Sequence, residues 1–158
     1  MEEIRFRAIN YKGKRLYVFD PNGKYSHKNG KFVITTKKKV LKDETIKATI
    51  RKLLKSNPKI TSKVKGIKNI EKKLYYIKVW IITESNDLTV MKNHNKRGFR
   101  RYHLDHIFPI SQGFKENIPP KAIGDIRNLQ FLHFRKNLKK RDSVSERAKN
   151  IINEIISK

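Results

Sequence analysis

The sequence predicts an α+β protein with a β-rich N-terminal lobe, flanking helices and a C-terminal half built on two strands and a helix. Three observations predict this class. Apolar and charged residues alternate near the N-terminus, apolar residues recur at helical spacing in two later segments, and two short apolar runs flank a turn-rich segment between residues 102 and 134. A chain of 158 residues can form one modest domain or two small lobes.

The first forty residues are expected to form a small antiparallel sheet or a pair of hairpins. Apolar side chains alternate with charged ones over residues 4–8, and a similar alternation occurs around residues 16–18. Residues 20–23 (DPNG) favour a tight turn, because Pro fixes φ and Gly accepts a positive φ. A further strand is predicted over residues 31–36.

The middle of the chain predicts two helices separated by a linker. Residues 43–56 carry apolar side chains at helical spacing and end before Asn57-Pro58. Residues 59–70 are weakly patterned and form the candidate linker, so that residues 1–65 make the N-terminal lobe and residues 66–158 the second domain. The composition of residues 74–82 is typical of a strand, but its apolar spacing also fits a buried helix, which we prefer.

A packing helix is expected at the C-terminal end of the chain. Ser143 and Glu146 have the spacing of a capping box, in which the serine accepts from the first turn. One apolar stripe follows, formed by Val144, Ala148, Ile151, Ile152, Ile155 and Ile156.

The composition narrows the class of partner. Thirty-nine Lys and Arg against fourteen Asp and Glu leave a net charge of +25, which attracts polyanions: nucleic acid first, an anionic membrane surface second. The longest apolar run, residues 79–82, is far shorter than the roughly 20 residues that span a bilayer. The N-terminus lacks the apolar segment of a secretion signal, and the absence of cysteine excludes disulfides and thiolate zinc sites. We therefore expect a cytoplasmic protein.

Residues 102–142 carry the candidate site. Strand alternation places Leu104, His106 and Phe108 on one face and Asp105 on the other, and Pro109 ends the strand. A long loop rich in turn residues follows. The sequence then gives a second apolar strand opened by Asn128, and a helix over residues 135–142 that carries Asn137 and five basic residues.

Hydrolysis of a phosphodiester needs these residue types. A general base must activate water, and a histidine is largely neutral near pH 7. A hard cation must neutralise the leaving oxygen, and it prefers carboxylate and amide oxygen ligands. Basic side chains must hold the nucleic-acid backbone in line.

The order Asp105-His106, Asn128, Asn137 resembles the HNH, or ββα-metal, nuclease motif. Over roughly residues 74–142 the chain is similar to HNH endonucleases of bacteriophages, several of which are homing or nicking enzymes. The resemblance implies that His106 is the base and that Asp105 and Asn137 hold one Mg²⁺ or Mn²⁺. It also implies that Asn128 pins the loop and so fixes the His106 ring.

The roles of several other residues in the candidate site are less specific. His103 and His133 are possible accessory groups, although either could be structural, and Asn128 and Asn137 taken singly could be a turn residue and a solvated helix residue. The chain lacks the cysteine pairs that often brace the HNH fold, and Asn as the third motif residue favours Mg²⁺. The expected DNA contacts are Arg97, Arg100, Arg101, Arg135, Lys136, Lys139, Lys140 and Arg141.

The expected function is a metal-dependent endonuclease that acts on double-stranded DNA and leaves 5′-phosphate and 3′-hydroxyl ends. If the gene is phage-borne, the enzyme would act in the cytoplasm of the bacterial host. A monomer would nick and a homodimer could cut both strands. The alternatives are a degenerate HNH fold that binds nucleic acid without cutting and a small basic RNA-binding protein. The target sequence and the biological role, among homing, restriction, host DNA degradation and packaging, are not encoded in any recognisable pattern.

Overall fold

The computed structural model describes residues 6–11, 14–19 and 37–158, and side chains from residue 42 onward. The chain divides into two compact units, residues 1–48 and 49–158. In the first unit, β1 (Phe6–Tyr11) pairs antiparallel with β2 (Lys14–Phe19), which confirms the expected N-terminal hairpin. The predicted turn at residues 20–23 and the strand at 31–36 lie outside the described residues. Helix α1 (Lys37–Ser56) begins earlier than residue 43 and ends at the predicted position.

The predicted linker is instead part of the second unit. Residues Pro58–Val64 form a 3₁₀ helix, η1, and the side chains of Ile60 and Val64 are buried. Helix η1 contacts the next helix, α2. The chain's two compact units divide after Ala48, within α1, whereas the sequence predicted a domain boundary at residue 65.

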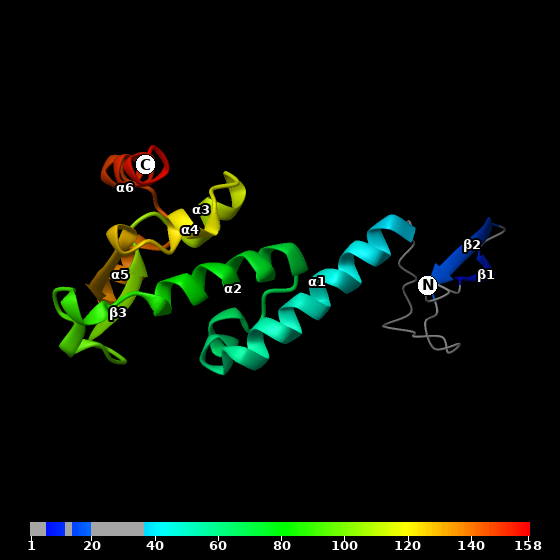
Figure 1. Ribbon diagram of the computed structural model, residues 1–158, viewed down its shortest axis with the longest axis horizontal. Coiled ribbons are helices and arrows are strands. Elements are labelled where there is room, and N and C mark those ends of the chain that lie inside the picture. Colours follow the sequence, from blue (N-terminus) through cyan, green and yellow to red (C-terminus); the bar gives the residue numbers. More distant parts are fainter. Residues whose placement is uncertain (1–5, 12–13, 20–36) are drawn as a thin grey trace. The chain divides into compact units, whose positions relative to one another are not determined.

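Helix α2 (Ile70–Ser85) is the central helix of the second unit. Its residues 74–82 were ambiguous in sequence, and the helical interpretation is confirmed. The side chain of Asn69 caps the first turn by accepting from the backbone N–H of Lys72 at 2.8 Å. Ile77, Val79 and Thr83 are fully buried, so the helix supplies a large part of the core. Figure 1 shows α2 beside α3 and α4, which it contacts.

A second hairpin and a short helix follow in the order expected from the sequence. After the 3₁₀ turns η2 (Leu88–Val90) and η3 (His94–Lys96), β3 (Tyr102–His106) pairs antiparallel with β4 (Leu129–His133). Helix α5 (Phe134–Lys140) contacts both strands. The chain is thus an α+β protein, mostly helical, with small two-stranded antiparallel sheets.

The segment between β3 and β4 is not the open loop that its turn residues suggested. It forms α3 (Ile110–Lys115), α4 (Pro120–Ile123) and the 3₁₀ turn η4 (Ile126–Asn128). Both α3 and α4 contact α2, and the fit is close at Gly113: a Cβ there would lie 2.7 Å from the Ile123 side chain and from the Tyr75 hydroxyl. Glycine is needed at this position for close approach, because any larger side chain would separate these elements.

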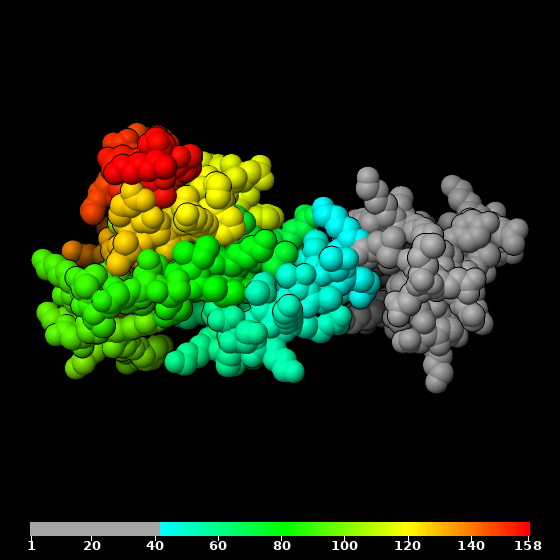
Figure 2. All heavy atoms as spheres, in the orientation of Figure 1, coloured from blue at the N-terminus to red at the C-terminus, as the bar shows by residue number. Residues whose placement is uncertain are grey.

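Helix α6 (Glu146–Ile156) closes the second unit. Its cap is Ser145, whose hydroxyl accepts from the N–H of Ala148 at 3.2 Å, so the predicted cap at Ser143 is wrong. Ser143 instead donates to the carbonyl of Lys140 at 2.6 Å. Ala148 and Ile152 are buried, and α6 contacts α4 and η4 as the packing helix that was expected (Figure 2). Within the described residues, no helix has the length and apolar character needed to cross a membrane.

Candidate functional site

Strand β3 presents the candidate residues on two opposite faces. Successive side chains of a strand point to opposite sides, so His103 and Asp105 share one face and His106 lies on the other. The face of Asp105 is covered by α5, and His106 is turned toward α2. The adjacent pair that the sequence singled out is therefore divided between two environments.

The carboxylate of Asp105 is held between β4 and α5. One oxygen accepts from Gln130 Nε2 at 2.8 Å, and the other accepts from Lys140 Nζ at 3.1 Å. The same ammonium donates to the carbonyl oxygen of His106 at 2.8 Å. The side chains of Asp105 and Lys140 are only 11% and 18% exposed, so this ion pair is much less screened than a surface pair.

Asn137 lies on the same side of the hairpin. Its Nδ2 is 3.4 Å from Nδ1 of His103, a long contact, and it precedes Lys140 by three positions on α5. Residues three apart on a helix are neighbours on its surface. The structure thus brings Asp105, Asn137 and Lys140 together with His103 between β3 and α5.

His106 is enclosed on the α2 side of the hairpin. Its side chain is 5% exposed, its ring meets that of Trp80 edge-on at 5.1 Å, and its Nε2 lies 2.9 Å from the hydroxyl of Thr83. Burial, with Lys140 and Lys63 nearby, lowers the pKa of His106 to about 3, since all three disfavour the cationic ring. The ring is therefore neutral at pH 7. If Nε2 carries the proton and donates to Thr83, a lone pair is left on Nδ1.

Asn128 ties the two strands together just beyond His106. It is fully buried, and its Oδ1 accepts from the backbone N–H of Phe108 at 2.7 Å. Its Nδ2 donates to the carbonyls of Phe108 at 3.2 Å and Ile123 at 2.8 Å. The tie expected of this residue is present, and its effect on catalysis stays a prediction.

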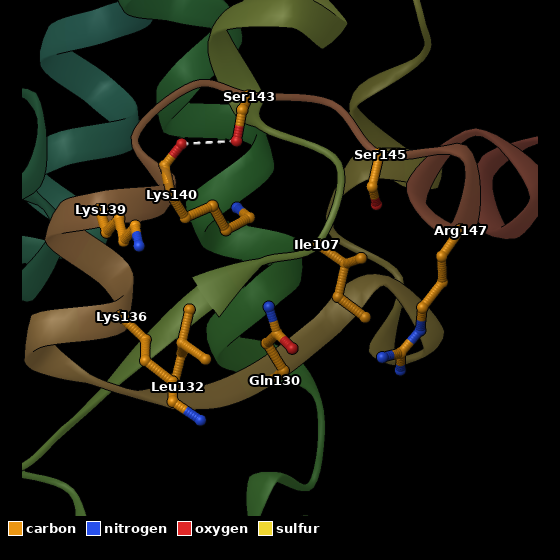
Figure 3. A pocket seen from close by; sticks show the side chains of 9 residues that line it. All are labelled: Ile107, Gln130, Leu132, Lys136, Lys139, Lys140, Ser143, Ser145 and Arg147. Carbon is orange, nitrogen blue, oxygen red and sulfur yellow. Dashed lines mark hydrogen bonds between the residues drawn. The ribbon is translucent and has the colours of Figure 1, made fainter.

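A basic hollow adjoins the Asp105 face (Figure 3). Lysines from α5 and Arg147 from α6 line it, beside Gln130, the residue that binds Asp105. Arg147 was not predicted, because its helix had been assigned to packing alone. The full lining is Ile107, Gln130, Leu132, Lys136, Lys139, Lys140, Ser143, Ser145 and Arg147.

A second hollow, of about 430 Å³, reaches His103 and Asn137 from the side of α2. Trp80 lines it, with the ammonium of Lys63 4.7 Å from its ring centroid. Arg97 also lines it and forms an ion pair with Glu84 at 3.1 Å. Positive charge therefore lies on both sides of the Asp105–Asn137 region.

The remaining predicted residues lie at the edges of the site. Arg100 and Arg101 are exposed in the turn before β3, and Arg135 is exposed on α5, its guanidinium carbon 5.8 Å from the Phe134 ring centroid. Arg141 is exposed just after α5. His133 contacts the rings of Tyr102 and Phe134, an arrangement typical of packing.

The side chains near Asp105 determine whether the expected Mg²⁺ or Mn²⁺ could bind there. In the part of the chain that is described, no group of three His, Asp or Glu side chains could hold an ion. Asp105 and Asn137 offer one carboxylate and one amide oxygen, which fits Mg²⁺, since this ion retains several waters and uses few protein ligands. Lys140 already binds one oxygen of Asp105, so a dication there would have to displace that ammonium.

Sequence reasoning missed Thr83, Gln130 and Arg147. Thr83 is buried in a helix, and nothing in its local sequence indicates that it faces His106. Gln130 could have been found from strand register, because it stands directly opposite Asp105. Comparison of the chain with protein-family models, curated proteins and solved structures gives no match.

Proposed function

We propose that the protein is a divalent-metal-dependent DNA endonuclease of the HNH type. The observation that carries the proposal is that two neighbouring positions on one face of β3 meet α5: Asp105 binds Lys140, and His103 lies 3.4 Å from Asn137. The buried Asn128 supports it by tying the chain immediately after His106.

The charge of the protein favours nucleic acid as the substrate. The net charge is +25, and lysines and arginines line the hollows beside Asp105 and beside Asn137. Such side chains attract and position a phosphate backbone without reading its sequence. Double-stranded DNA is the proposed ligand.

Each chemical role has a candidate residue. Asp105 and Asn137 would hold the metal, which when bound would neutralise charge on the leaving oxygen. His106 would accept a proton from water at Nδ1, with Nε2 held by Thr83, so that the ring keeps a fixed orientation. Lys136, Lys139 and Arg147 would bind phosphates and hold the strand in line.

The pKa of His106 is lowered first by burial and then by nearby positive charge, and both causes bear on its role as a base. A ring with a pKa near 3 is a weak base in the free protein. Two of the causes are the positive charges of Lys140 and Lys63, and a bound phosphate would offset them. A bound phosphate would therefore offset only the smaller, electrostatic part of the lowered pKa of His106, and the larger part, from burial, would stay.

A second candidate function is DNA binding without cleavage. It is favoured by the Lys140 ammonium on Asp105, which occupies the carboxylate, and by the burial of His106. It differs from the first in one observable: metal would have no effect on the DNA product.

Supercoiled plasmid tests the proposal directly. Purified protein is incubated with Mg²⁺, Mn²⁺ or EDTA, beside Asp105→Asn and the matched control Asp142→Asn, which removes an exposed carboxylate just beyond α5. We expect metal-dependent nicking with 5′-phosphate ends, lost in Asp105→Asn and kept in Asp142→Asn. Binding of the plasmid without cleavage in either metal would establish the second candidate instead.

A further inference from the structure

The turn that precedes β3 carries an unusually exposed aromatic residue. Phe99 is 88% exposed, the highest value for a large apolar side chain among the described residues. An isolated exposed apolar residue is common on protein surfaces and needs no explanation by itself. Three further features of this turn indicate a purpose.

The turn is held rigidly. The Gly98 N–H donates to the Tyr102 carbonyl, and the Arg101 N–H donates to the Gly98 carbonyl, both at 3.1 Å. The Arg101 carbonyl accepts from the N–H of Phe134, the first residue of α5, at 2.8 Å. Phe99 is thus presented on a braced turn and not on a loose loop.

The backbone of the turn is bent to project Phe99. Arg100 has a φ of 58°, in the left-handed region that non-glycine residues seldom occupy. At the other side of the turn, Arg97 is fixed to Glu84 at the end of α2 by an ion pair of 3.1 Å. An apolar ring therefore stands in water between an arginine with left-handed backbone and an arginine paired with Glu84.

Positive charge surrounds the ring. Arg97, Arg100 and Arg101 flank it, and the Arg100 guanidinium carbon is 5.8 Å from the ring centroid. Phe99 also lines the hollow that reaches His103 and Asn137. A polyanion bound at that hollow would meet the ring and the arginines together.

We propose that residues 97–102 form a DNA wedge, in which the Phe99 ring inserts against a base step of duplex DNA while Arg100 and Arg101 contact the flanking phosphates. The proposal rests on the proposed function in taking DNA as the ligand. Apolar wedges of this kind partly unstack a base step, and aromatic rings stack on bases regardless of sequence. A cluster of arginines alone would bind phosphates but would leave the stack intact.

Affinity for a labelled duplex, measured by fluorescence anisotropy in EDTA over a range of salt, separates the ring from the charges. We expect Phe99→Ala to lower affinity on the order of 10- to 100-fold with an unchanged salt slope, because no charge is lost. Phe99→Tyr, which keeps a ring, should bind like the wild type. Arg100→Ala should reduce the salt slope by about one. Val90→Ala, at another exposed apolar residue, is the matched control and should have no effect.

Unwinding tests insertion itself. A plasmid relaxed by a metal-independent type I topoisomerase in EDTA should change its linking number when the wild type is bound, and should not when Phe99→Ala is bound. Wild-type affinity in Phe99→Ala, or binding by the wild type without unwinding, would overturn the wedge. Neither measurement requires cleavage. A protein that never cuts but needs Phe99 to bind and unwind would refute the endonuclease alone, and one that cuts without needing Phe99 would refute the wedge alone.

Discussion

The two faces of β3 use adjacent residues in opposite ways. On the α5 face, the side chain of Asp105 is held by a lysine and a glutamine at the margin of a basic hollow. On the α2 face, His106 is a neutral ring enclosed by Trp80 and Thr83. Adjacent residues thus differ in environment: Asp105 is paired with the ammonium of Lys140, whereas the fold keeps the ring of His106 neutral.

The difference shows how a hairpin can separate the two halves of one reaction. Groups that bind cations need nearby negative charge and access to water, whereas a base must stay neutral until a proton reaches it. Strand alternation provides both conditions without any extra chain. If the proposed function is right, the scissile phosphate would have to be reached from both faces at the end of β3.

The largest effect is expected from removing the base. His106→Asn should lower the rate of plasmid nicking on the order of 10²- to 10⁴-fold, the usual contribution of a general base. Thr83→Val should cause a smaller loss of activity, because it removes the hydrogen bond to Nε2 of His106 but leaves the imidazole in place. His103→Asn serves as the comparison on the other face and should retain most activity. Full activity in His106→Asn together with loss in His103→Asn would move the base to the α5 face.

The hydrogen bonds that the Asn128 side chain makes across the hairpin should contribute to stability. Asn128→Ala would leave the N–H and the carbonyl of Phe108 and the carbonyl of Ile123 without their partner in a buried site. We expect a loss of roughly 3 kcal/mol in the free energy of unfolding, measured with urea. Asn153→Ala, on the exposed surface of α6, is the control and should change stability by less than about 0.5 kcal/mol. An equal, small effect of both variants would mean that Asn128 does not hold the hairpin.

The neutral ring of His106 predicts a dependence of stability on pH. The pKa of His106 is about 3 in the folded protein and 6.5 in its ordinary state, so only the unfolded chain takes up a proton between these values. The stabilisation is complete above pH 6.5 and is lost as the pH falls toward 3. Between pH 6.5 and 4.5 this amounts to roughly 2 kcal/mol.

Urea unfolding in EDTA at several pH values measures this contribution of His106 to the free energy of unfolding. The wild type should lose more stability toward pH 4.5 than His106→Asn, by about the amount stated. Parallel curves for the wild type and His106→Asn would show that the ring is not kept neutral by the fold.

The smallest effect concerns the ammonium on the α5 face. Lys140→Met removes the cation that Asp105 now binds, so Mn²⁺ should bind roughly 5- to 10-fold more tightly in the absence of DNA, as expected for one neighbouring charge at a partly buried site. Titration followed by electron paramagnetic resonance measures this. Lys139→Met, from the same hollow, is the matched control and should change affinity less. Weaker binding in Lys140→Met would mean that the lysine helps to build the metal site.

Several features could be predicted because their causes are local. The hairpin β1–β2, the order β3, β4, α5 and the helical stripe of α6 follow from alternation and periodicity, which are properties of a few neighbouring residues. The ambiguous residues 74–82 could also be assigned, since an apolar run of that spacing fits a buried helix. Asn128 was placed correctly at the junction of the two strands.

The predictions that were wrong depended on contacts between segments that are distant in the sequence. Residues 58–64 looked like a linker, yet Ile60 and Val64 are buried beside α2, and the turn-rich segment after β3 folds into short helices because it has α2 to cover it. Helix α6 is capped by Ser145, because the hydroxyl of Ser143 donates to the Lys140 carbonyl at the end of α5.

The sequence by itself determined which residue types were available and their order along the chain: an Asp-His pair, two asparagines and a surplus of positive charge. Only the tertiary structure decided that Lys140 pairs with Asp105, that Thr83 holds His106 and that Arg147 joins the basic hollow. The physical reason is that Lys140 and Thr83 are 35 and 23 residues away from their partners along the chain, so no local pattern of side chains encodes these contacts. Their positions are set by α5, which packs on the β3–β4 hairpin, by α2, which faces His106, and by α6, which packs on α4 and η4.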